Sequence, residues 1–526
     1  MASRQFINAD YEATLDVQVR LGDVLPADHP ARFLVDLLHL VDFGAFRAHF
    51  GVKGGRPYDP LVLCGLLIHG YIHGLFSSRR IERATYEDLG YRYVAGNLHP
   101  DHDTLAHFRK TFLPEIAEVF VQVLLMAKLS GVLLLEAVSN DGTKIHANAS
   151  KSAAVSYGRL LALEQELRAE VEALLAQAAQ ADGSEEATRL QEESSRREER
   201  LAQLALARRV LEERAAARDA EEQAAYEAKR AERAAKQAAT GKVPRGKEPQ
   251  PPTLGPQAKD QYNFTDPASR IMKESKSGGF EQSYNAQVAT DQGSMLITGA
   301  QVADQPNDVQ QLLPTLDAIP PAVGKPAAAT ADAGFFSEPN IQGCAAREID
   351  PFIATGREPH RWPLDEVLTP PTAAGPEAPS PAGTVAVPAT PRAAMAAKLR
   401  QPAGRAIYRL RKCTVEPAIG IIKEAMGFRQ FSLRGLDAVN GEWLLVCLAY
   451  NIKRLRTLWG GVVPAAAQTT DAARQAAALV VVLLTALASL LGHLFQHDTR
   501  AAGKPSPNAT HTVLCRRGVG FSPTSC

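Results

Sequence analysis

The chain has 526 residues, which is too long for one hydrophobic core and favours several domains or one domain with large insertions. Its 58 basic and 58 acidic residues give a net charge of zero, so affinity for nucleic acid must come from a local patch. The six cysteines have no CxxC spacing, which argues against a zinc site and a disulfide framework, and the first residues lack the apolar run of a secretory signal. We therefore expect a cytoplasmic protein.

Residues 1–130 are predicted to form a helical N-terminal domain. Long apolar stretches in this region have the spacing of amphipathic or buried helices. Between them, a polar segment predicts a short helix, a turn and a second helix that carries Arg109 and Lys110. Such a helix pair could dock these two side chains on DNA, and plain helical packing with a solvated basic face explains the same pattern equally well.

The next segments predict one α/β domain that is interrupted by an insertion. Residues 131–156 contain a short apolar run that predicts a strand with Asp141 at its end. Residues 157–256, rich in Ala, Glu, Arg, Gln and Leu, predict a helical or coiled-coil insertion that ends in a proline-rich break. Strand patterns return over residues 257–362, where Asp332 also follows an apolar run and is followed within two residues by glycine.

The last third of the chain divides by composition. Residues 363–394 are a Pro/Ala/Thr/Gly segment that predicts a flexible linker, and helices are expected from Met395 through residues 395–460. Residues 461–526 form a divergent tail. Its apolar stretch 476–491 is shorter than the roughly 20 residues of a membrane span, so we expect a buried or self-associating helix and no membrane partner.

The strongest local charge lies between residues 398 and 456. This segment contains twelve Lys and Arg residues and four acids. Its net charge of +8 would attract duplex or cleaved DNA. Within this segment Tyr408, Lys412 and Glu416 follow one another at helical i+4 steps, and Lys423 comes seven residues after Glu416. The four side chains could therefore share one helix face.

Proline at position 417 bears on the helix that carries Glu416. Because proline disfavours helical geometry in the preceding residue and lacks a donor, we expect a new helix to begin there, with Glu416 near its N-terminus. Arg411, Lys412 and Lys423 would hold phosphates around a metal bound by Glu416. The alternative is an ordinary basic helix surface.

The three acidic motifs, taken together, suggest phosphoryl transfer. That chemistry neutralises an anionic transition state and activates a water or a 3′-hydroxyl, which two divalent ions about 4 Å apart do together. Magnesium prefers oxygen ligands and keeps several waters, so Asp141, Asp332 and Glu416 would suffice. Either aspartate alone is more typical of a residue that caps or turns the chain. Asp291 and Asp304 could replace the second ligand, but both lie beside hairpin-like turns and fit a structural role better.

The spacing of Tyr408, Lys412, Glu416 and Lys423 resembles the Tyr-Arg-Glu-Lys signature of bacterial insertion-sequence transposases of the DDE class. Lysine stands where that signature usually has arginine, and the arginine here is Arg411. NDGTKIHANAS and TADAGF resemble the blocks around the two aspartates, GRPYDPLVLCGLLIHGYIHGLFSSRRIE and HPDHDTLAHFRKTF the helical N-terminal domain, and GFRQFSLRG with NGEWLLVCLAYNIKRL the closing segment. The resemblance covers most of residues 1–160, 260–360 and 395–458.

This resemblance implies an α+β protein in which a helical N-terminal domain precedes an RNase H-like catalytic domain with a long helical insertion. It also implies binding of terminal inverted repeats and target DNA as a homo-oligomer, strand cleavage and strand transfer, dependence on Mg²⁺ with Mn²⁺ as a substitute, and association with the nucleoid. By position, the metal ligands would be Asp141, Asp332 and Glu416, and the contacts to the DNA end Tyr408, Arg411, Lys412 and Lys423.

Two other functions compete with an active transposase. One is a catalytically inactive, transposase-derived protein that still binds DNA ends. The other is a coiled-coil interaction protein, suggested by residues 157–239. The three acidic motifs in order, with basic partners beside them, argue against the second.

Overall fold

A computed structural model provides the structure of the protein. It describes residues 20–51, 56–181, 185–241, 243, 246–273, 279–356 and 390–467, which fall in one compact unit, Met1–Thr469. The apolar stretch 476–491 and most of the expected linker lie outside the described residues. Among the helices of the described ranges, none combines the length and apolar character that crossing a membrane requires.

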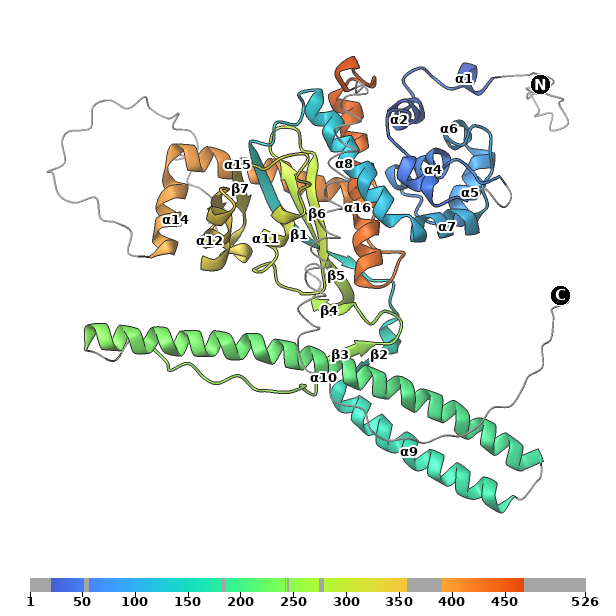
Figure 1. Cartoon of the computed structure of the whole chain (residues 1–526), viewed down its shortest axis with the longest axis vertical. Helices are drawn as coiled ribbons and strands as arrows, with labels where there is room; N and C mark the ends of the chain where they lie inside the picture. Colours follow the sequence, from blue (N-terminus) through green and yellow to red (C-terminus); the bar gives the residue numbers. More distant parts are fainter. Residues whose placement is uncertain are drawn as a thin grey trace, which may run out of the picture. The chain divides into compact units, whose positions relative to one another are not determined.

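The first part of the described chain is helical, as predicted (Figure 1). Its central helix, α4, is buried along nearly its whole length. Asp59 caps α4 by accepting a hydrogen bond from the Leu61 backbone amide, and Pro60 occupies the first helical position, where its missing N–H is harmless. The helices of this region are α1 Leu21–Val24, α2 Pro30–Leu38, α3 Gly44–Ala48, α4 Pro60–Ile72, α5 Ser78–Glu87, α6 Leu89–Val94, α7 His102–Thr111 and α8 Leu113–Leu129.

A mixed β-sheet follows, in the order β4-β5-β1-β7-β8, with β6 pairing with β5. The β4–β5, β5–β6 and β5–β1 pairs are antiparallel, whereas β1–β7 and β7–β8 are parallel. A mixed sheet with helices is consistent with the predicted RNase H-like domain. The strands are β1 Ala137–His146, β4 Arg270–Lys273, β5 Phe280–Asp291, β6 Ile297–Ala303, β7 Ala328–Ala331 and β8 Asp350–Ile353.

Strand β1 differs from the prediction, because Asp141 lies in its middle and not at its end. The apolar run that was expected to be the strand precedes it, and Leu133 there is buried in the core. Strand β5 pairs with β1 from Val138 to His146 and so extends it well past the aspartate. The parallel neighbour β7 pairs only with residues 137–139, so Asp141 stands just beyond the end of β7.

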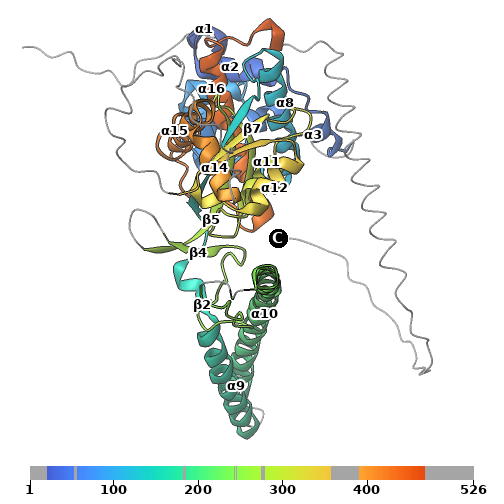
Figure 2. The same ribbon diagram turned by 90° about the vertical axis from the view of Figure 1, so that its left-hand side faces the viewer.

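Residues 157–240 form a helical hairpin. Its helices, α9 Tyr157–Gln180 and α10 Glu185–Thr240, pack side by side (Figures 1 and 2). A two-stranded ribbon, β2 Ala154–Ser156 with β3 Gln261–Asn263, joins the hairpin to the rest of the chain. The hairpin has a separate small core made of Leu160, Leu167, Leu204, Ala207, Leu211 and Tyr262. Its packing is therefore largely independent of the main core.

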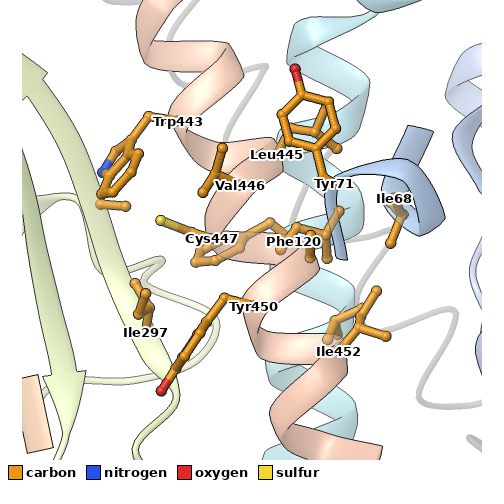
Figure 3. Packing of buried hydrophobic residues seen from close by; sticks show 14 of the residues in the cluster. Ile68, Tyr71, Phe120, Ile297, Trp443, Leu445, Val446, Cys447, Tyr450 and Ile452 are labelled. Carbon is orange, nitrogen blue, oxygen red and sulfur yellow. The ribbon is translucent and has the colours of Figure 1, made fainter. Parts of the chain in front are cut away.

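The C-terminal helices cover the sheet and join it to the N-terminal helices. Helix α16 is buried among β6, α8 and α4, and Figure 3 shows Trp443, Cys447 and Tyr450 of α16 between Ile297 of β6 and Phe120 of α8. The main hydrophobic core therefore runs through both parts of the chain. The helices after β6 are α11 Leu312–Asp317, α12 Glu338–Ala346, α14 Pro391–Arg400, α15 Pro402–Gly420 and α16 Leu436–Leu458.

Two helix boundaries differ from the prediction. Helix α14 begins at Pro391, four residues before Met395, because Thr390 caps it through the Ala393 amide. Helix α15 continues through Pro417, so no new helix begins there, and Glu416 lies near its C-terminal end. Packing of buried α15 residues on β1, β5 and β7 holds the helix together despite the proline. A π-helical turn, Ile421–Ala425, follows directly.

Candidate catalytic centre

The parallel register of β1 and β7 brings Asp141 and Asp332 together. Ser139 is aligned with Thr330, so two residues further on Asp141 is aligned with Asp332. Since side chains alternate along extended chain, both aspartates project to the same side of the sheet. The backbone of Asp332 is extended, and its carboxylate accepts a 2.8 Å hydrogen bond from the Gly334 amide, which fixes the side chain at the end of β7.

Helix α15 brings the third carboxylate to the same place. Arg411 of this helix lies between Asp141 and Glu416, with Nη1 3.4 Å from Asp141 Oδ2 and Nη2 3.1 Å from Glu416 Oε1. The Arg411 side chain is only 9% exposed, whereas that of Glu416 is 48% exposed. A buried cation therefore links the strand carboxylate to the helix carboxylate.

Burial and charge act in opposite directions on Asp141. The pKa of Asp141 is raised to about 6, mainly by burial and to a smaller extent by the negative charges of Asp332 and Glu416, while Arg411 and the Gly142 amide oppose the rise. Burial by itself would lower the pKa of Arg411, but Asp141 first, and then Tyr408 and Glu416, raise it. The three acids are thus close enough to repel one another, and Arg411 compensates part of that repulsion.

Polar contacts beneath the carboxylates attach α15 to the strands. Thr414 Oγ1 donates a 2.8 Å hydrogen bond to Ser139 Oγ on β1. Gln292 Nε2 donates to Ser139 Oγ at 3.0 Å, to Thr330 Oγ1 at 3.3 Å and to the Ile407 carbonyl at 3.2 Å. Strands β1 and β7 and helix α15 therefore hold the three acids on one connected framework.

Two stretches of the chain match known family models. Residues 19–111, which cover the N-terminal helices, match a transposase domain (DUF772), and residues 252–452, which contain Asp332 and Glu416, match the transposase DDE domain. The two matches indicate an insertion-sequence transposase of the DDE class. Asp141 and both helices of the hairpin lie between the two matched stretches. No curated protein matches the chain, and no solved structure does.

DDE transposase domains use divalent metal ions. The chemistry of the centre fits such an ion, because three carboxylates supply hard oxygen donors and already draw the Arg411 guanidinium between two of them. Within the described ranges, no three His, Cys, Asp or Glu side chains are arranged closely enough to hold an ion as they stand. Asp141 and Glu416 form ion pairs with Arg411 instead.

The expected DNA-contacting residues of the transposase lie on both sides of Glu416. Tyr408 is half-buried and close enough to Arg411 to affect its pKa, and Lys412 is exposed on α15. Lys423 follows in the π-helical turn, where its Nζ donates a 3.0 Å hydrogen bond to the Lys144 carbonyl of β1. Next to Lys423 is a cavity of about 380 Å³, lined among others by Gly142, Lys144, Asp308 and Arg429.

Arg109 is buried, whereas the sequence left it either on a helix that docks on DNA or on a packed helix with a solvated basic face. It is 7% exposed, and its Nη1 donates to the Phe76 carbonyl at 2.7 Å and to Tyr71 Oη at 3.2 Å. Arg109 is buried because its position on α7 directs the side chain toward Tyr71 of α4. Lys110, the next residue, is exposed at the end of α7.

The two alternative acids are structural. Asp291 is 2% exposed and accepts hydrogen bonds from the backbone amide and the hydroxyl of Ser294, which closes the turn between β5 and β6. Asp304 forms an ion pair with Arg270 of β4. Asp291 is therefore used by its own turn, and Asp304 by its ion pair with β4.

Sequence reasoning missed one acid that the fold attaches to β5, Asp308. It lies in the loop after β6, and its carboxylate accepts hydrogen bonds from Asn285 and Gln287 of β5. The only signal in the sequence was the alternation of Ser283, Asn285 and Gln287 in an otherwise buried strand, which marks a polar strip inside the sheet. Nothing in the pattern connects that strip to an aspartate some twenty residues later.

Proposed function

We propose that the transposase cleaves DNA at the ends of its insertion sequence and joins the cut strand to target DNA. The observation that supports this proposal is the convergence of Asp141, Asp332 and Glu416 around Arg411. The three carboxylates would hold Mg²⁺, for which Mn²⁺ substitutes. Bound divalent ions neutralise charge at the scissile phosphate and activate a water or a 3′-hydroxyl for attack.

The residues of the chain contribute rigidity and low exposure. Asp141 is held within a long strand, and its Oδ1 accepts a 2.9 Å hydrogen bond from the Gly142 amide. The Asp332 carboxylate is fixed by the hydrogen bond that it accepts from the Gly334 amide. Ligands on strands are held more accurately than ligands on loops, which suits a reaction that needs in-line geometry. Glu416 is the most exposed of the three, so an approaching DNA end would reach it first.

The DNA end would lie along α15 and the π-helical turn. Tyr408, Arg411 and Lys412 precede Glu416 on this path and Lys423 follows it, so basic side chains flank the carboxylates on both sides. Phosphates would be held by these side chains, with Arg411 offering the planar fork that Lys412 lacks. Lys110 is proposed as a further phosphate contact from the N-terminal helices.

We propose that two copies of the chain bind the paired ends of the element. The helical hairpin offers a surface for this assembly, because Leu175 of α9 and Leu206 of α10 are 47% and 49% exposed. Exposed leucines on an otherwise charged hairpin are suited to packing against another helix.

The proposal is tested with labelled DNA that carries the element's own ends, in Mg²⁺, in Mn²⁺ and with a chelator. Wild type is compared with Asp141→Asn, Asp332→Asn and Glu416→Gln, which remove charge and preserve shape. Asp317→Asn serves as the matched control, since the Asp317 carboxylate forms an ion pair with Arg347 instead of Arg411. End binding is measured separately, by gel shift in the presence of the chelator.

Metal-dependent cutting by wild type and Asp317→Asn, with loss of at least 100-fold in each of the three variants and retained end binding, is the expected result. Full-rate cutting by any one variant would remove that residue from the ligand set. End binding by wild type without cutting in either metal would favour the inactive, DNA-binding relative over an active transposase.

A further inference from the structure

Helix α5 has one buried side and one exposed side that is rich in arginine. Ile81, Ala84 and Thr85 form the buried side, which packs among the other N-terminal helices (Figure 1). The opposite side faces solvent, as in other amphipathic helices at a protein surface. It carries three exposed arginines, Arg79, Arg80 and Arg83.

The acids of α5 neutralise only one of these arginines. Arg83 Nε lies 2.7 Å from Glu87 Oε1, in an ion pair across one helical turn. Glu82 is used elsewhere, since its Oε2 accepts a 3.2 Å hydrogen bond from the His102 amide of α7 and lies 2.8 Å from Nδ1 of the same residue. Within the described ranges, the other two arginines form no ion pair or hydrogen bond. Two adjacent positive charges therefore remain to attract an external anion.

An exposed aromatic side chain continues the same face. Arg79, Arg83 and Tyr86 follow at i, i+4 and i+7, so they form one row along α5. Tyr86 is 57% exposed, and its ring stacks on His99 with centroids 3.9 Å apart and an angle of 11° between the planes. His99 is held in turn, because its Nδ1 lies 2.9 Å from Thr85 Oγ1. Tyr86 is therefore an exposed but restrained side chain, which loses little entropy when it binds a partner.

The start of α5 lies close to the π-helical turn, the segment that carries Lys423. Just before α5, Gly74 adopts a left-handed φ of 75°, and a Cβ there would lie 2.9 Å from the Met426 carbonyl oxygen. The ring of Phe76 packs edge-on against that of Phe428, with centroids 5.2 Å apart. The two unpaired arginines of α5 follow these contacts within about one helical turn.

Arg109 of α7 fixes the segment that leads into α5. Its buried Nη1 donates a 2.7 Å hydrogen bond to the Phe76 carbonyl, one residue before the N-cap of α5. Helix α7 thus supports α5 from the protein interior, and α5 presents its arginines on the outside.

We propose that the exposed face of α5 binds the phosphate backbone of the duplex that adjoins the element end, through Arg79, Arg80 and Tyr86. The inference rests on the proposed function, in which α15 and Lys423 hold the cleaved end itself. A duplex that leaves the π-helical turn meets α5 next, because the start of α5 contacts the chain directly after that turn. Guanidinium groups and a tyrosine hydroxyl bind phosphate oxygens without reading the base sequence.

The alternative is a basic helix face that only remains in water. The two roles differ in the salt dependence of DNA affinity. Each phosphate contact releases counterions from the duplex and adds about 0.9 to the slope of log affinity against log salt concentration. A face that stays in water adds nothing to this slope. The slope therefore separates the two roles without any cleavage of DNA.

DNA affinity of the full chain is measured by fluorescence anisotropy between about 50 and 200 mM NaCl, with chelator present. The probes are a labelled duplex of the element's own end and an unrelated duplex of the same length. Arg79→Gln combined with Arg80→Gln removes both charges, and Arg79→Lys combined with Arg80→Lys keeps them. Tyr86→Phe removes the hydroxyl and keeps the ring that stacks on His99.

The control of equal charge is Arg47→Gln combined with Arg92→Gln. Both arginines belong to the N-terminal helices, and each already has a partner there, the Asp59 carboxylate for Arg47 and the Asn97 amide oxygen for Arg92. Circular dichroism melting confirms that every variant is folded.

We expect the double glutamine variant of α5 to bind both duplexes about tenfold or more weakly at low salt, with a slope smaller in magnitude by about 1–2. Tyr86→Phe should bind both duplexes a few-fold more weakly, whereas the lysine variant and the control should stay within about threefold of wild type. Wild-type affinity and slope in the glutamine variant, or an equal loss in the lysine variant or the control, overturns this inference and leaves the proposed function intact. A wild type that binds neither duplex contradicts the proposed function itself.

Discussion

At the scale of single residues, Asp141 shows what it costs to bury a carboxylate in the centre. Its pKa of about 6 lies above the roughly 3.9 of an aspartate in an unfolded chain. The folded chain therefore binds this proton more tightly than the unfolded chain between about pH 4 and pH 6. Because stability falls with pH wherever the folded state holds more protons, this group lowers stability as pH rises to about 6 and keeps it lowered above.

Asp141→Asn removes this ionisation and is expected to stabilise the metal-free protein at pH 8. A difference of two pKa units corresponds to on the order of 2–3 kcal/mol, which should shrink toward zero at pH 4. Urea unfolding of both proteins with chelator across that range measures it. Equal stability at pH 8, or a difference that does not depend on pH, would contradict the assigned pKa of Asp141.

Arg411 leads to a second prediction, in which two readouts move in opposite directions. Arg411→Gln removes the cation that lies between Asp141 and Glu416, so Mn²⁺ should bind several-fold more tightly at pH 8. Cleavage of element ends should fall by 10-fold or more, because Arg411 also holds phosphate in the proposed function. Arg405→Gln, on an exposed turn of the same helix, is the control. A parallel fall in both readouts would exclude competition between Arg411 and the metal.

The individual residues also show what sequence could and could not predict. Asp141, Asp332 and Arg411 were nominated because each belongs to a local motif with recognisable neighbours. Asp308 was missed because only the fold of the loop after β6 brings it to β5. The burial of Arg109 was missed for a similar reason, since the direction of a helix face depends on what packs against it. Local patterns identify side chains, and tertiary packing decides what those side chains face.

At the scale of elements, β1 and α15 departed from their predictions because neighbours overrode local preference. Strand β1 was expected to end at Asp141, after the apolar run, but pairing with β5 from Val138 to His146 extends it past the aspartate. Helix α15 was expected to break at Pro417, but its packing on the strands keeps it continuous. The helical N-terminal part and the mixed fold class were predictable, since long periodic runs are less sensitive to such context.

We therefore expect Pro417 to strain helix α15. Pro417→Ala restores the backbone donor to the Cys413 carbonyl and should raise stability, by up to about 3 kcal/mol if the proline causes no compensating rearrangement. The same change relaxes the helix next to Glu416, so we expect slower cleavage of element ends despite higher stability. Thermal unfolding and the cleavage assay test this together. Lower stability would show that the proline fits α15 and its π-helical turn better than alanine does.

At the scale of the whole described molecule, a buried carboxylate joins the N-terminal helices to the catalytic domain. Glu442 of α16 is 0% exposed, and its Oε1 accepts a 2.6 Å hydrogen bond from Tyr71 Oη of α4. Its Oε2 accepts from the backbone amides of Ser432 and Leu433 at 2.8 and 2.9 Å. Arg109 adds positive charge to the same network. One carboxylate thus connects α4 and α7 with the loop before α16.

Glu442→Gln should destabilise the protein strongly, by roughly 3–5 kcal/mol, because an amide cannot accept at both ends and Arg109 loses its compensating charge. Tyr71→Phe removes only one hydrogen bond to a charged group and should cost about 1.5–3 kcal/mol. If the network couples the two regions, calorimetry of Glu442→Gln should show the N-terminal helices unfolding before the catalytic domain, whereas Tyr71→Phe keeps one transition. A single transition in Glu442→Gln, shifted no further than in Tyr71→Phe, would mean that the apolar core around α16 alone holds the two regions together.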